Sequence, residues 1–91
     1  MTVQLIKEKL TTALAPELLE VTDNSQAHAG HAGAQSGGGH YHVVITARVF
    51  TGKSLVQRHQ LIYQALGDMM KTQIHALGIE ASTPSEIKQR N

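Results

Sequence analysis

The stretch His40–Phe50, "HYHVVITARVF", constrains the fold of this chain more than any other. Apolar residues recur at every second position from Val43, and such alternation is typical of a strand that lays one face on a core. We therefore expect His40–Phe50 to be the main strand of a sheet. Val43, Ile45, Ala47 and Val49 fall on one face of that strand, and Val44, Thr46 and Arg48 on the other.

A helix and a short strand are expected before it. Four apolar residues recur at three- and four-residue steps, which indicates an amphipathic helix: Val3, Ile6, Leu10 and Leu14. Pro16 disfavours helical geometry at Ala15, so the helix should stop there. The stretch Leu18–Asn24, "LLEVTDN", alternates apolar and polar residues and predicts a short strand.

A helix, a strand and a final short helix are expected after it. Thr51-Gly52 forms a turn and Ser54 is a good N-cap. The apolar stripe of the following helix runs to about Lys71: Leu55, His59, Ile62, Leu66 and Met69. The next strand is Ile74–Ala81, which alternates His75, Leu77, Ile79 and Ala81. In "TPSE", Thr83 is an N-cap, Pro84 opens a helix and Glu86 completes a capping box.

This order predicts an α+β fold of the type helix, strand, strand, helix, strand, helix. Two successive strands joined by a loop are expected to be antiparallel, whereas a strand that follows a helical crossover can lie parallel to one of them. We expect one domain over residues 1–91, with a three-stranded mixed sheet, helices packed on one face, and a flexible His/Gly-rich loop over about residues 25–39.

The composition argues for binding rather than catalysis. The chain has no cysteine, so thiolate nucleophiles and disulfides are excluded. Its seven acidic residues are scattered, and no serine stands in a nucleophile-elbow context. We therefore expect that it is not an enzyme. No apolar run is long enough to span a membrane, and the first ten residues carry no leader pattern, so we expect a cytoplasmic protein.

Histidines gather where glycine is most frequent. Residues 27–42 hold four of the six histidines and five of the eight glycines. His28 and His31 lie three apart, and neutral imidazole is the commonest metal ligand at neutral pH. A metal site and a glycine-rich linker with incidental metal affinity both fit this pattern. His59, on the apolar helix stripe, is better explained as a structural histidine than as a general base.

The basic residues allow a second functional interpretation, which is nucleic-acid binding. Lys53, Arg58 and Lys71, together with Arg48, could form a basic patch around the second helix. A solvated helical face explains the same residues, and the net charge of +1 is far below that of a dedicated nucleic-acid binder.

Two segments make a family resemblance specific. "FTGKSLVQRHQLIYQAL" and "IHALGIEASTPSE" resemble the two signature segments of the BolA family, and "LEVTDNS" and "HYHV" fit as well. The resemblance covers roughly residues 18–86. It implies a class II KH-like fold, which agrees with the element order above.

The resemblance also implies a partner. BolA-like proteins bind monothiol glutaredoxins and share a [2Fe-2S] cluster with them, with glutathione supplied on the partner side, in iron–sulfur cluster trafficking and iron regulation. The histidine of "HAL", here His75, corresponds to the near-invariant ligand. In the histidine-loop subfamily the second ligand corresponds to His28, with His31 as a close competitor. On its own the chain is expected to be a monomer or a weak homodimer.

Some members of the family are described as DNA-binding transcriptional regulators, which is the alternative implied for Lys53, Arg58 and Lys71. Gln60 stands where the family usually has an arginine, so one cation of that surface is absent here.

Overall fold

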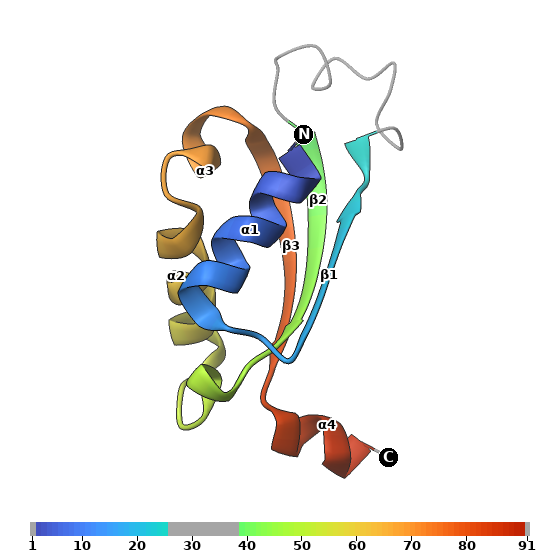
Figure 1. Cartoon of the computed structure of the whole chain (residues 1–91), viewed down its shortest axis with the longest axis vertical. Coiled ribbons are helices and arrows are strands. Elements are labelled where there is room, and N and C mark those ends of the chain that lie inside the picture. Colours follow the sequence, from blue (N-terminus) through green and yellow to red (C-terminus); the bar gives the residue numbers. More distant parts are fainter. Residues whose placement is uncertain (1, 26–38, 91) are drawn as a thin grey trace.

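The computed structural model describes residues 2–25 and 39–90 (Figure 1). The helices and strands follow the predicted order, with two short helical segments added. They are α1 (Thr2–Leu14), β1 (Leu18–Asp23), β2 (Gly39–Thr46), the 3-10 turn η3 (Arg48–Phe50), α2 (Leu55–Leu66), α3 (Met69–Thr72), β3 (Ile74–Ser82) and α4 (Pro84–Arg90). No helix in these two ranges is long and apolar enough to cross a membrane.

The sheet is mixed, as predicted, with β2 in its centre. The strand order is β1-β2-β3; β1 runs antiparallel to β2 and β3 runs parallel to it. Val43 in β2 lies opposite Val21 in β1 and Ile79 in β3, so the apolar positions of the three strands line up. This register places one apolar face along the whole width of the sheet.

The core lies between that face and the layer formed by α1 and α2 (Figure 1). The helix α1 ends at Leu14, and Ala15 takes a positive φ of 47° before Pro16, a left-handed C-terminal cap that usually needs glycine. The helix α4 lies apart from this layer, beyond the end of the sheet. The largest fully buried side chains are Phe50, Ile6, Leu10, Ile45, Ile62, Leu66 and Val43.

The predicted main strand is too long by four residues. It ends at Thr46, and the chain turns through η3, so Val49 is 42% exposed and Phe50 is fully buried in its place. In a strand every second side chain lies on the same face, whereas in a 3-10 turn every third one does. The inward-facing position therefore moves from Val49 to Phe50.

The predicted second helix is interrupted. It ends at Leu66, because Gly67 takes a positive φ of 56°, and the chain restarts as α3 at Met69. Ser54 forms the N-terminal cap as predicted, in a capping box with Gln57. Leu55, expected on the buried stripe, is 63% exposed instead.

Arg58 ties α2 to the start of α4. Its guanidinium donates to both carboxylate oxygens of Glu86, at 2.8 and 2.9 Å, and to the carbonyl of Ala81 at 3.1 Å. Glu86 also accepts the backbone N–H of Thr83, and the Thr83 hydroxyl accepts that of Glu86, which is the predicted capping box. The hydrogen bonds to Glu86 raise the pKa of Arg58 above its usual range.

Removing this carboxylate should destabilise the fold. The side chain of Arg58 is only 8% exposed, so Glu86→Ala leaves a buried guanidinium without its carboxylate and also removes half of the cap. We expect the free energy of unfolding to fall by about 2 kcal/mol in urea titrations.

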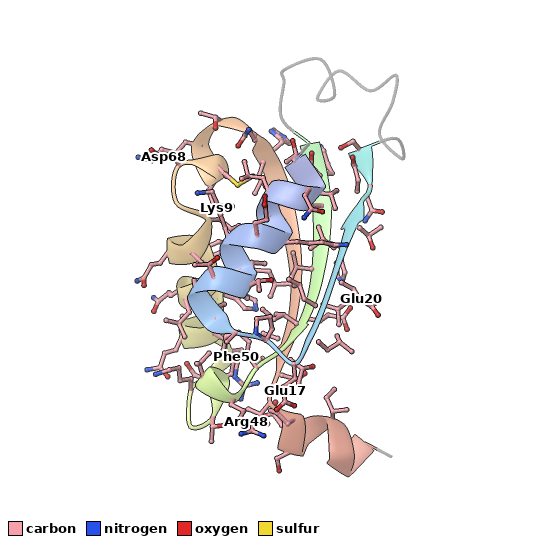
Figure 2. The ribbon with its side chains drawn as sticks, in the orientation of Figure 1. Lys9, Glu17, Glu20, Arg48, Phe50 and Asp68 are labelled. Atoms are coloured by element: carbon pink, nitrogen blue, oxygen red, sulfur yellow. The ribbon has the colours of Figure 1, made fainter. Side chains whose placement is uncertain are left out.

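The control is Glu17→Ala, which removes the partner of Arg48 at the same end of the sheet (Figure 2). Because the Arg48 side chain is 84% exposed, this loss should stay below about 1 kcal/mol. Equal losses in the two variants would contradict a structural role for the Arg58–Glu86 pair.

Candidate functional site

The candidate site lies at the end of the sheet that carries Asp23, Gly39 and Ile74. The strand β1 ends there, and β2 and β3 begin there (Figure 1). Two backbone hydrogen bonds close this end: Asn24 N–H donates to the carbonyl of His40 at 2.7 Å, and Gly39 N–H donates to that of Gln73 at 3.0 Å. Asn24 is therefore held to β2, and Gly39 is held to the residue that precedes β3.

A bulge between β2 and β3 sets the direction of His75. Gly39 lies opposite Ile74 and His40 lies opposite Ala76, which leaves His75 as the extra residue without a partner in β2. Bulges shift the side-chain alternation of a strand and re-aim a side chain. Ile74 accordingly enters the core, with 3% of its surface exposed, while His75 is exposed. The predicted alternation is wrong at this one residue, because His75 does not share the face of Leu77 and Ile79.

His40 meets His75 across the bulge. The centroids of the two imidazole rings are 5.1 Å apart, and their planes are inclined by 39°. His40 itself is half-buried, its Nε2 atom is buried, and its backbone N–H donates to the Ser25 hydroxyl at 3.1 Å. The sequence did not indicate this pair, because the two residues are 35 positions apart and meet only through the bulge.

The two predicted loop ligands, His28 and His31, lie outside the described residues. Ser25, the last described residue before them, is held beside His40. Three extended residues span at most about 10 Å, which is the largest distance that the chain permits between the Cα atoms of Ser25 and His28.

The described side chains of the site do not form a complete set of metal ligands. Within residues 2–25 and 39–90, no three His, Cys, Asp or Glu side chains are grouped so that they could hold a metal ion. Of the described residues at this end, His75 offers an exposed imidazole, but further ligands must come from another part of the chain or from another molecule.

The remaining described histidines have other neighbours. His42 lies on the same sheet face as His40, and its Nε2 atom is 2.7 Å from Oε2 of Glu80. Its ring lies across Gly78, where an added Cβ would come within 2.6 Å of Nδ1. His59 is half-buried on α2 and meets the edge of the Tyr63 ring at 6.4 Å, which agrees with a structural histidine.

The predicted basic residues do not form one cluster. Arg58 is buried against Glu86, and its Cζ atom lies 6.0 Å from the Phe50 ring centroid, so its guanidinium faces the protein. Lys53 and Lys71 are exposed, but the twelve residues of α2 separate them by about 18 Å of helix. Arg48 is exposed and bonds Glu17 at 2.8 Å, while Glu20 lies farther along β1 (Figure 2).

Comparisons with known proteins identify relatives. The family model described as BolA-like protein matches residues 10–86. SufE-like protein 1, chloroplastic/mitochondrial, of Arabidopsis thaliana is 47% identical over 87 residues, which are 90% of this chain and 24% of that protein. BolA-like protein 1 of Mus musculus is 38% identical over 84 residues, 92% of this chain and 59% of that protein. The DNA-binding transcriptional regulator BolA of Escherichia coli is 40% identical over 81 residues, 89% of this chain and 74% of that protein.

Solved structures agree. The BolA domain of SufE1 from Arabidopsis thaliana superposes with a TM-score of 0.81 at 46% identity, covering 93% of this chain and 94% of that domain. A bol-like protein from Babesia bovis gives a TM-score of 0.83 at 32% identity, covering 100% of this chain and 94% of that one. The plant SufE-like protein and the mouse protein are thus longer than this chain, which spans 24% and 59% of them.

The hydrogen bonds between Ser25 and Asp23, at the end of β1, can be tested by pH titration. Bonds from the Ser25 side chain and backbone N–H hold the pKa of Asp23 below its ordinary value of 3.8. A carboxyl group whose pKa is lowered by folding stabilises the folded state at pH values above its unfolded pKa. This stabilisation is lost as the pH falls below about 4. Ser25→Ala should therefore raise the Asp23 pKa, measured from its carboxyl 13C shift by NMR.

Thr22→Ala is the matched control, since it leaves both groups of the turn in place. An Asp23 midpoint that is the same in wild type and Ser25→Ala would contradict a hydrogen bond from the Ser25 side chain to Asp23.

Proposed function

The chain belongs to the BolA family, and on this premise we propose that it is an accessory protein that binds a monothiol glutaredoxin and co-ligates a shared [2Fe-2S] cluster through histidines. Its role would be cluster trafficking or iron regulation. The observation that carries the proposal is His75: the bulge turns this imidazole out of the core, at the end of the sheet where the histidine-rich segment is attached.

The absence of cysteine fits a shared cluster. Iron–sulfur clusters are ordinarily held by thiolates, and two histidines replace two thiolates on one iron in Rieske centres. Because this chain has no thiolate, the thiolates must be those of the glutaredoxin and of glutathione bound to it. The contribution of this chain would be neutral imidazole, which raises the reduction potential of the cluster.

The second ligand is proposed to be His28 or His31. The described residues on either side of positions 26–38, Ser25 and Gly39, are next to His40, whose ring contacts His75. Chain length therefore allows either histidine to approach His75.

Binding rather than catalysis is proposed, by a monomer or weak homodimer. A cytoplasmic location is the expectation from the sequence. Two relatives from Arabidopsis thaliana are named chloroplastic/mitochondrial and chloroplastic, respectively.

The second candidate function is DNA binding. Its support is the name of the Escherichia coli relative, a DNA-binding transcriptional regulator. Lys53 and Lys71 would carry it here, because Arg58 is buried against Glu86. Two separated lysines form a weaker electrostatic footprint than a basic patch.

The leading proposal predicts a change in the cluster spectrum. Adding this chain to a cluster-loaded monothiol glutaredoxin should change the visible circular dichroism and saturate at one to one. His75→Ala should abolish the change, because it removes an iron ligand. His59→Ala, which removes an imidazole from α2, should retain it.

The pH dependence of cluster retention provides a second test in the same assay. A histidine ligand must be unprotonated, so cluster retention should fall as the pH drops through about 6.5, the ordinary pKa of imidazole. An unchanged spectrum with wild type, or retention that stays flat from about pH 8 to 5, would contradict the proposal.

The DNA alternative has its own test. Fluorescence anisotropy over a salt series should give only non-specific affinity, with Kd of about 10⁻⁴ to 10⁻⁶ M at physiological salt for every duplex. Lys53→Ala and Lys71→Ala should each reduce the salt slope by about one, and Arg58→Lys should not. A duplex bound about a thousandfold more tightly would favour the transcriptional role instead.

A further inference from the structure

The pairing of His40 with His75 suggests a role for a residue outside the proposed ligand set. His75 is the bulged residue of β3, so no cross-strand partner fixes its backbone position against β2. The described neighbour of its ring is the imidazole of His40, at a centroid separation of 5.1 Å. Such a separation is ordinary for packed aromatic rings.

His40 is itself firmly held. Its carbonyl accepts Asn24 N–H at 2.7 Å and its N–H donates to the Ser25 hydroxyl at 3.1 Å. The residue opposite it in β3 is Ala76, whose small side chain leaves room for a ring to lie across the strand. His40 is therefore a fixed surface beside an exposed ring.

We propose that His40 is a positioning residue that holds the His75 imidazole in its ligating orientation by ring packing. This inference rests on the proposed function, since it concerns the same site. His40 is not itself the exposed ligand, because its Nε2 atom is buried while His75 is exposed.

The physical gain is preorganisation. An exposed side chain loses rotamer freedom when it binds, and a ring that already lies against a fixed neighbour loses less. Residues that orient a metal ligand typically change metal affinity by about 10- to 100-fold when they are removed. Because packing depends on the shape of the ring and not on its nitrogens, phenylalanine should replace His40.

The experiment compares His40→Ala with His40→Phe, and His42→Ala is the matched control. His42 is an imidazole of the same strand and face, but it contacts Glu80 instead of His75. Each variant is titrated against a cluster-loaded monothiol glutaredoxin and followed by visible circular dichroism. We expect His40→Ala to weaken binding about tenfold or more, and His40→Phe and His42→Ala to stay within about threefold of wild type.

A second readout needs no cluster. In the protein alone, NMR should show cross-relaxation between the ring protons of His40 and His75. The His75 ring shifts should move in His40→Ala and stay displaced from free-histidine values in His40→Phe. Backbone amide spectra show that each variant is folded, and His40→Phe keeps the test available if His40→Ala does not fold.

The outcomes separate the two proposals. Wild-type binding lost in His75→Ala but unaffected by His40→Ala would overturn the role of His40 alone. Equal losses in His40→Ala and His40→Phe would also overturn it, since a nitrogen of His40 would then be required. An unchanged spectrum with wild type would overturn the proposed function and, with it, the role of His40 toward a cluster, whatever contact the NMR data show between the rings.

Discussion

The central strand β2 needs hydrogen-bonding neighbours on both sides, and they run in opposite directions. The antiparallel neighbour β1 precedes β2 in the chain, whereas the parallel neighbour β3 requires a crossover, which α2 and α3 provide. That crossover covers one sheet face together with α1 and encloses the apolar core. The same arrangement brings the end of β1 and the starts of β2 and β3 to one end of the sheet.

At that end, one strand must satisfy two demands. The core needs an apolar side chain where β3 begins, and the proposed site needs an exposed imidazole from the adjacent residue. In a regular strand, two adjacent side chains point to opposite faces, so one could be buried and the next exposed. Leu77 and Ile79 would then lie on the same exposed face as His75. The bulge resolves this by shifting the alternation, so Ile74, Leu77 and Ile79 all pack on the core while His75 leaves it.

Local patterns accounted for most of the fold. The spacing of Ile6, Leu10 and Leu14, the caps at Ser54 and Thr83, and the alternation in the strands predicted the element order and the mixed sheet. Gly67 followed by Asp68 is a recognisable helix stop, so the break before α3 could have been predicted from the sequence. The apolar run through Val49 concealed the turn that buries Phe50.

The geometry of the candidate site could not be predicted from local sequence patterns. His75 was identified through family resemblance, but its escape from the core depends on the pairing of Gly39 with Ile74, a long-range contact that no local pattern encodes. The burial of Arg58 depends in the same way on Glu86, 28 residues away. Alone in the sequence, Arg58 is a cation available to DNA; in the fold it is a structural tie between α2 and α4.

The proposed function requires that an imidazole of this chain bind iron directly. Its most direct test is pulsed electron paramagnetic resonance on the reduced complex, with only this chain labelled with 15N-histidine. We expect 15N couplings of directly bound imidazole, which disappear in His75→Ala. A cluster that forms between the two proteins and shows no 15N coupling from this chain would contradict it.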